Sequence, residues 1–197
     1  MKIKNPFFLK KKNIYLSDIF KILGKKNIKK NIKINNISDL TSASINDISF
    51  INNLKYLEVL KKSKVKYIIS NKIHFNKIKD FCSPIIVDNV LKSVYAVTNL
   101  FYPDSLNDAV DFNTEYPDKN KFKKIKFGKN VLVGKNVKIG KNTLIGHNSI
   151  IESNVIIGSK CIIGNNVIIK NSILGDNVRV LDGSVIGKKG FGFFPEK

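Results

Sequence analysis

The sequence predicts a mixed fold, in which a small amino-terminal α/β domain precedes a three-sided parallel β-solenoid. Two observations predict it. From residue 127 onward, as in FGKNVLVGKNVKIG (127–140), an aliphatic or aromatic residue returns at every sixth position and is usually followed by glycine. Before residue 103, short apolar runs alternate between helical and strand spacing. We therefore expect a domain over 1–102, a linker containing Pro117 over 103–126, and the repeats over 127–197.

The first domain is expected to alternate short helices and strands. The strand segments are runs rich in β-branched and aromatic residues, such as VKYIIS. The helical segments carry apolar residues at helical spacing, and the last of them begins at Asp88, a good N-cap residue. The expected strands are 48–51, 65–70 and 84–87, and the expected helices are 15–26, 54–63 and 88–102.

Each six-residue repeat is expected to form a short strand and a corner. The fifth residue of one repeat and the first of the next lie two positions apart, so both point to one face of a strand. Glycine and asparagine fill the positions between, where a corner requires backbone freedom or a positive φ. Such units close into three-sided coils whose strands stack about 4.8 Å apart, which gives nearly four coils and a height of about 18 Å. The inward first residues are Phe127, Val133, Ile139, Ile145, Ile151, Ile157, Ile163 and Ile169 and, after a one-residue slip, Leu174, Val180 and Ile186; the inward fifth residues are Val131, Val137, Thr143, Ser149, Val155, Cys161 and Val167.

Composition narrows the class of protein but identifies no partner. The chain of 197 residues is 43% hydrophobic and 25% charged, and it has no apolar run that fits a membrane span or a signal peptide. We expect a cytoplasmic protein that does not span a membrane. The net charge of +20 is almost all lysine and is spread along the chain, so we attribute it to biased composition and expect no nucleic-acid binding. Cys82 and Cys161 are expected to be structural thiols, and no metal site is predicted.

Three features beside the hexads resemble one family. The segment 38–70 carries Phe50, Asn53 and Tyr56 at three-residue spacing. Residues 190–193 form a Gly-Phe-Gly-Phe loop at the end of the repeats, and the repeat frame slips by one residue shortly before it. Together these features resemble the UDP-3-O-acylglucosamine N-acyltransferases of lipid A biosynthesis, which are hexapeptide-repeat acyltransferases.

The resemblance implies a left-handed parallel β-helix that forms a homotrimer with active sites between neighbouring subunits. It implies transfer of a 3-hydroxyacyl group from acyl carrier protein to the 2-amine of UDP-3-O-acylglucosamine. No cofactor is implied beyond the phosphopantetheine that carries the acyl donor. Two alternatives stay open. One is another hexapeptide-repeat sugar-nucleotide N-acyltransferase, which would usually lack the FINNLKY segment, and the other is a non-catalytic solenoid.

The resemblance also assigns a nucleotide site. Phe50 and Tyr56 would hold the uracil ring between them, and the Asn53 amide would offer both a donor and an acceptor. Stacking of a base on an aromatic side chain is worth about 1–3 kcal/mol. From the residues alone, core packing is the preferred explanation of Phe50 at a strand end, and Tyr56 on the next helix is also explained as a packed aromatic side chain.

The loop formed by Phe191, Gly192 and Phe193 has two interpretations that stay open. It either helps to wall the site for the acyl chain or the pantetheine arm, or it is a hydrophobic turn that covers the last coil. The catalytic base of the family, a histidine in an Ala-His-Asn element, is expected after this loop and beyond Lys197. No catalytic residue is therefore assigned within the chain, and we expect no turnover from these residues alone.

The two histidines of the chain are not expected to replace that base. Amide formation requires a base that takes a proton from the attacking amine, and histidine suits this role because its ordinary pKa is about 6.5. His74 lies in the polar stretch NKIHFNKIK and is expected at the surface. His147 follows Ile145 by two positions and is expected to face solvent at a corner.

Overall fold

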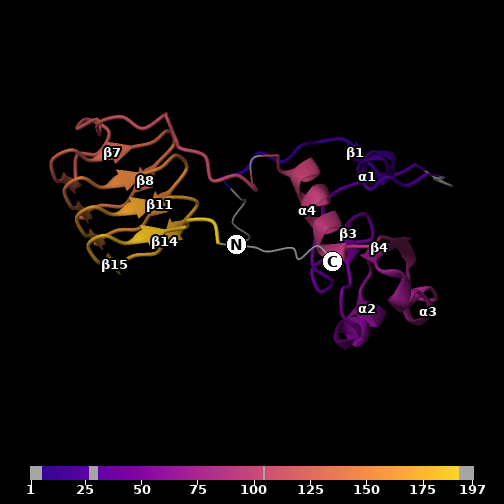
Figure 1. Cartoon of the computed structure of the whole chain (residues 1–197). Coiled ribbons are helices and arrows are strands. Elements are labelled where there is room, and N and C mark those ends of the chain that lie inside the picture. Colours follow the sequence, from indigo (N-terminus) through magenta and orange to yellow (C-terminus); the bar gives the residue numbers. More distant parts are fainter. Residues whose placement is uncertain (1–5, 27–30, 104, 191–197) are drawn as a thin grey trace. The chain divides into compact units, whose positions relative to one another are not determined.

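The computed structural model describes residues 6–26, 31–103 and 105–190 (Figure 1). Apart from the start of the chain, the described residues form two compact units that divide between residues 106 and 107. Most of the segment 103–126 therefore belongs to the same unit as the repeats. Each unit has its own hydrophobic core.

The first unit is built around a three-stranded parallel sheet in the order β3-β4-β5. Its strands overlap the three strand segments expected from the sequence, and the expected helix 54–63 is a 3-10 turn followed by an α-helix. The elements are β1 (Ile14–Tyr15), α1 (Leu16–Ile22), β2 (Lys33–Ile34), β3 (Ile48–Phe50), η1 (Leu54–Tyr56), α2 (Leu57–Lys62), β4 (Tyr67–Ser70), η2 (Lys72–His74), α3 (Phe75–Ile78), β5 (Ser83–Ile86) and α4 (Val90–Phe101).

The start of α4 differs by one residue from the expectation. Asn89, and not Asp88, is the N-cap, and its side-chain oxygen accepts a hydrogen bond of 3.0 Å from the Lys92 backbone amide. Both residue types cap helices well, so the sequence could not choose between two adjacent candidates.

Helices cover both faces of the sheet. Neighbouring residues of a strand point to opposite faces, and Ile69 and Ile68 of β4 accordingly lie in different core clusters. Ile69 packs in the cluster that includes residues of α1 and α4, whereas Ile68 packs in the cluster that includes Leu60 of α2 and Ile78 of α3. The sheet is therefore the middle layer of three.

The second unit is a parallel β-solenoid, which confirms the architecture predicted from the six-residue period (Figure 1). Eleven two-residue strands form three parallel sheets in the orders β16-β13-β10-β7, β14-β11-β8 and β15-β12-β9-β6. The strands are β6 (Lys126–Phe127), β7 (Leu132–Val133), β8 (Lys138–Ile139), β9 (Leu144–Ile145), β10 (Ile150–Ile151), β11 (Ile156–Ile157), β12 (Ile162–Ile163), β13 (Ile168–Ile169), β14 (Ile173–Leu174), β15 (Arg179–Val180) and β16 (Val185–Ile186).

The solenoid core follows the predicted positions. All seven predicted fifth-position residues are buried, and the first-position residues are either buried or, like Ile139, packed against the core from its edge. The buried hydroxyls are satisfied: Thr143 donates to the Gly158 carbonyl at 2.9 Å, and Ser149 donates to the Gly164 carbonyl at 2.9 Å. Polar side chains at these positions thus hydrogen-bond to the next coil.

Asparagine and glycine have separate roles at the corners. The positive φ values belong mainly to the asparagines, such as Asn130 at 57° and Asn148 at 56°. The glycine that follows most inward residues is needed for a different reason. A Cβ at Gly146 would lie 2.4 Å from the backbone oxygen of Gly164 in the next coil. Close approach of successive coils, and not a positive φ, requires glycine at this position.

The start of the second unit forms a strap along one corner of the solenoid. We define the strap as residues 107–125. It runs against the direction of the coils, because Asp108 contacts Lys170 after β13, Asp111 contacts Ser153 after β10, and Glu115 pairs with Val133 of β7. At the end of the strap, Phe122 is 7% exposed and lies edge-on to Phe127, with ring centroids 5.6 Å apart. Phe122 therefore covers the core at the first coil.

Candidate functional site

The three residues assigned to nucleotide binding lie in one connection of the first unit. Phe50 ends β3, Asn53 follows three residues later, and Tyr56 ends η1. This connection leaves the carboxyl end of a parallel strand, where ligands commonly bind in sheets flanked by helices. The connection therefore lies at the edge of the sheet where ligands commonly bind.

Each of the three side chains already has a local environment. Phe50 is partly buried and packs against the core cluster of α1 and α4. The Asn53 side-chain oxygen caps η1 by accepting a hydrogen bond of 2.9 Å from the Lys55 amide, which leaves its NH₂ group as the donor that could reach a ligand. Tyr56 is 47% exposed, and the Lys55 ammonium lies 4.9 Å from its ring centroid. Tyr56 is thus the aromatic side chain most available to a base.

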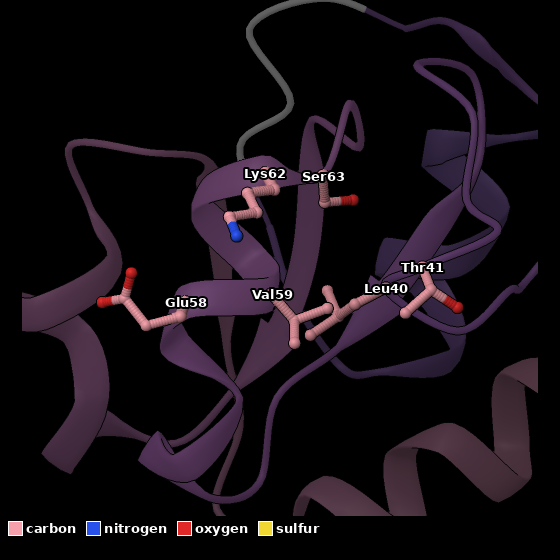
Figure 2. Close-up of a pocket in the computed structure, with 6 residues that line it drawn as sticks. All are labelled: Leu40, Thr41, Glu58, Val59, Lys62 and Ser63. Carbon is pink, nitrogen blue, oxygen red and sulfur yellow. The ribbon is translucent and has the colours of Figure 1, made fainter.

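A cavity of about 370 Å³ lies next to this connection (Figure 2). None of the three assigned residues lines it. Two polar groups that line the cavity are already engaged, because the Thr41 hydroxyl donates to Asp39 and Glu58 is paired with Lys61 at 2.7 Å. Figure 2 shows its six lining residues, Leu40, Thr41, Glu58, Val59, Lys62 and Ser63. We therefore assign no ligand to this cavity.

The residues Phe191, Gly192 and Phe193, assigned to the acyl or pantetheine site, lie outside the described residues. Their role stays a prediction.

His147 is exposed at a corner, as expected, and its ring takes part in the stacking of coils. The backbone amide of Lys129 donates a hydrogen bond of 2.8 Å to His147 Nδ1, and the His147 amide donates one of 2.8 Å to the side chain of Asn165. One coil further, the Asn165 amide donates to Asp182 at 2.7 Å. Because Nδ1 accepts a hydrogen bond from the Lys129 amide, the ring proton of a neutral His147 lies on Nε2. The exposed nitrogen is then a donor, and His147 is poorly suited to be a general base.

His74 is more buried than expected. It ends η2 and is of intermediate exposure, and its Nδ1 atom is buried without a hydrogen-bond partner among the described residues. The polar stretch around it suggested a surface position, but the structure leaves His74 only partly exposed. With no nucleophile or carboxylate bonded to it, His74 forms no catalytic pair within the described part of the chain.

The thiols do not provide a nucleophile either. Cys161 is buried in the solenoid, and burial raises the pKa of Cys82 to about 11. A thiol with so high a pKa is protonated at neutral pH and reacts slowly. Both cysteines are therefore structural, as expected.

A charged cluster under the strap was missed from the sequence. The Lys170 ammonium lies 2.9 Å from Asp108 and 3.2 Å from Glu152, and the Lys170 side chain is 11% exposed. Beside it, Asp111 accepts a hydrogen bond of 2.7 Å from the Ser153 amide. A signal was present, because Glu152 and Lys170 stand eighteen residues apart at the position that glycine usually fills.

The pKa values of this cluster follow from its contacts. The hydrogen bond from Lys170 lowers the pKa of Asp108, and the same bond raises the pKa of Lys170. Burial raises the pKa of Glu152, and the Lys170 contact only partly offsets that effect. For Asp111, burial acts to raise the pKa, but hydrogen bonds from Ser153 and Asn113 outweigh it and lower the pKa to about 2. Charge pairing thus fixes the strap to the solenoid, and the cluster offers no free base.

The described residues offer neither a metal-binding cluster nor a membrane-spanning helix. They contain no group of three or more histidine, cysteine, aspartate or glutamate side chains arranged to hold a metal ion. Within the same residues, no helix combines the length and apolar character of a membrane span.

Comparison with known proteins identifies the repeats. Residues 124–158 and 136–171 match the family model of the bacterial transferase hexapeptide (six repeats). The matched residues are those that form coils of the solenoid, from β6 to β13. The chain therefore carries the hexapeptide repeat of bacterial transferases. No curated protein matches the chain.

Proposed function

We propose that the chain is part of a UDP-3-O-acylglucosamine N-acyltransferase of lipid A biosynthesis. Its acyl donor is a 3-hydroxyacyl group on acyl carrier protein, and its acceptor is the 2-amine of the UDP-sugar. The proposal rests on the hexapeptide repeat together with the resemblance of the segment 38–70 to the nucleotide-binding domain of that family. The left-handed coil of that family belongs to the same proposal.

One observation carries the nucleotide part of the proposal. Phe50, Asn53 and Tyr56 lie within a single strand-to-helix connection at the carboxyl end of β3. Tyr56 is the exposed aromatic surface, Phe50 is anchored by the core, and the Asn53 amide nitrogen is not used by the η1 cap. Uracil offers a flat ring for stacking and carbonyl oxygens that accept from an amide NH₂ group. These three groups are suited to hold it.

In the proposed reaction, the amine nitrogen attacks the thioester carbonyl. The N–C bond forms, the C–S bond breaks, and the phosphopantetheine thiol leaves with a proton. The amine must lose a proton to a base, and hydrogen-bond donors must stabilise the oxyanion. Because His147 Nδ1 accepts the Lys129 amide and His74 has no hydrogen-bonded partner among the described residues, we assign the base to neither residue.

The solenoid also offers a surface for the proposed homotrimer. On the sheet β16-β13-β10-β7, the outward residues Leu132, Ile150, Ile168 and Val185 are all aliphatic and stand in register. The other two sheets place Lys126, Lys138 or Arg179 at the equivalent positions. An aliphatic stripe across successive coils suits a self-association face better than a sheet that carries unpaired cations.

A titration with UDP tests the nucleotide site. Amide signals of residues 48–57 should shift on addition of UDP, and Tyr56→Ala should weaken binding by about 1–3 kcal/mol through loss of one stacking face. Tyr95→Ala, which removes a tyrosine of 44% exposure from the outer surface of α4, is the control. Unchanged UDP affinity in a folded double variant, Phe50→Ala with Tyr56→Ala, would exclude the clamp.

The acceptor then distinguishes this enzyme from other sugar-nucleotide N-acyltransferases. UDP-3-O-acylglucosamine should compete with UDP more strongly than UDP-N-acetylglucosamine does, because the proposed acceptor carries a free amine and a 3-O-acyl chain. Equal competition by both nucleotides would favour the alternative enzymes over the proposed one.

A further inference from the structure

We infer that the first-coil end of the solenoid is a docking surface for an acidic protein partner. This inference does not rest on the proposed reaction, because it needs only the charges and the shape of this end of the molecule. The surface, called here the lysine hollow, is formed by Lys121, Lys123, Lys124, Lys126 and Lys141 with the residues between them.

The lysines of the second unit are concentrated at this end, directly after residues 107–118, which contain four acidic residues and no lysine. Residues 119–141 contain nine lysines and no acidic residue. Residues 142–190 contain four lysines and one arginine against three acidic residues. A composition bias alone would spread lysine evenly over coils that share one repeat. The concentration at the first coil therefore calls for an explanation of its own.

The lysines of the hollow are available. All five are exposed, and none forms an ion pair with another described residue. By contrast, Lys170 at the strap is paired with two carboxylates. Like charges held close together repel, so an anionic partner would relieve that repulsion as well as gain direct contacts.

The surface is concave and partly apolar. Two adjoining hollows of about 210 Å³ and about 610 Å³ are lined by the lysines, by Asn120 and Asn142, and by the aliphatic side chains of Ile125, Ile139 and Leu144. Leu144 stands beside Lys126 in the paired strands β6 and β9, and its side chain is 40% exposed. The lysine hollow therefore combines ammonium groups, which we call its rim, with aliphatic side chains, which we call its floor.

This combination favours a protein over other polyanions. A nucleic-acid surface would be expected to add arginine forks or exposed aromatic side chains for stacking, but the lining contains no arginine and its one aromatic residue, Phe122, is buried. A small phosphate ligand is usually cradled by glycine-rich backbone, and no glycine lines the hollow. An acidic helix with aliphatic side chains between its carboxylates would match both the rim and the floor.

A labelled helical peptide that displays glutamate and leucine on one face is the probe for the test. Two variants are compared with the unaltered chain. The hollow variant carries Lys123→Glu, Lys124→Glu, Lys126→Glu and Lys141→Glu. The control variant carries the same change at four exposed lysines of the first unit, Lys64, Lys72, Lys77 and Lys79. Both variants therefore have the same net charge.

We expect the peptide to bind and the hollow variant to weaken binding by about tenfold or more, with a much smaller change in the control variant. A further, milder variant with Lys→Gln at the same four positions of the hollow should also weaken binding of the peptide. Equal loss in hollow and control variants would show attraction by net charge alone and would overturn the proposal. The proposal would also be overturned if the peptide did not bind. It would be overturned equally if a single-stranded oligonucleotide or phosphatidylglycerol vesicles bound the hollow more tightly than the peptide does.

Discussion

At the scale of single residues, His147 has a structural role in the hydrogen bonds that join the corners of successive coils. Its ring accepts the Lys129 amide in the same way that Asn165 and Asp182 accept the amides one coil earlier. His147→Asn should therefore leave stability nearly unchanged, because asparagine already performs this function in the next coil. His147→Ala removes the acceptor from an exposed amide and should cost about 1 kcal/mol or less.

Chemical denaturation of both His147 variants would measure this difference. A loss of several kcal/mol on His147→Asn would mean that the imidazole contributes something other than a hydrogen-bond acceptor. Nucleotide affinity serves as the internal control, since the proposed nucleotide site lies in the other unit.

At the scale of elements, the glycines after the inward strand residues set how closely coils can stack. Gly146→Ala would place its Cβ 2.4 Å from a backbone oxygen of the next coil, so the two coils must separate. We expect a loss of about 1–3 kcal/mol or more, as for other overpacked sites. Gly175→Ala occupies an equivalent repeat position, but nothing lies within 4 Å of the added Cβ.

The paired alanine variants can be compared by thermal unfolding of the solenoid. Gly175→Ala should be neutral or slightly stabilising, because alanine restricts the unfolded chain more than glycine does. Equal destabilisation by both substitutions would contradict the role given to coil contact.

The strap should respond to acid through Asp111. Its folded pKa of about 2 lies below the ordinary value of 3.8, so its ionised form stabilises the folded state. That contribution is fully present above the ordinary value and is lost as pH falls through the folded value. Between pH 4 and pH 2 the strap should therefore loosen, and Asp111→Asn should remove this part of the pH dependence.

Carbon-detected NMR of the Asp111 carboxyl would give its pKa directly. Denaturation at several pH values would give the linked change in stability. Glu152 has a raised pKa and so works in the opposite direction, since its protonation favours the folded state. An Asp111 pKa at or above the ordinary value would refute the assigned hydrogen bonds.

At the scale of the whole molecule, the two separate cores imply that a core substitution destabilises only the unit that contains it. Ile157 is 2% exposed in the solenoid core, and Ile157→Asp would bury an unpaired carboxylate there. We expect the solenoid to lose about 4 kcal/mol or more, whereas Ile157→Val should cost only about 0.5–1.5 kcal/mol. The first unit, with its own sheet and clusters, should keep its structure in both variants.

Amide spectra of the two Ile157 variants would test this independence. Residues 8–26 and 31–103 should keep dispersed signals in Ile157→Asp even if the solenoid signals collapse. Simultaneous loss of both sets would show that the units fold as one.

The periodic part of the molecule was predictable because each hexad repeats the same local requirement. Inward residues such as Val155 and Val167 can be assigned from the sequence, since a six-residue frame fixes which side chains point inward. The strap could not be predicted in this way. Lys170 and Asp108 lie sixty-two residues apart, and no period relates them. Only the replacement of glycine by Glu152 and Lys170 indicated that this corner differs.

For the candidate site, the sequence predicted the local structure but not the role of each side chain. Phe50 and Tyr56 fall where the strand and helix pattern placed them, at a strand end and at the start of a helix. Their function could not be read from residue type, because an aromatic ring that stacks on a base and one that fills a core satisfy the same local pattern. The two rings differ in burial, since Phe50 is partly buried against the core cluster and Tyr56 is 47% exposed.

The strap has a consequence for how the solenoid opens. In a simple stack each coil touches only its neighbours, so coils can fray one at a time from either end. Here one segment bonds to the coils that contain Val133, Ser153 and Lys170 in turn. Opening the first of these coils requires that the strap be released, and release removes a contact from the other two. Amide protons of these three coils should therefore exchange with solvent as a single cooperative unit rather than in order of distance from an end.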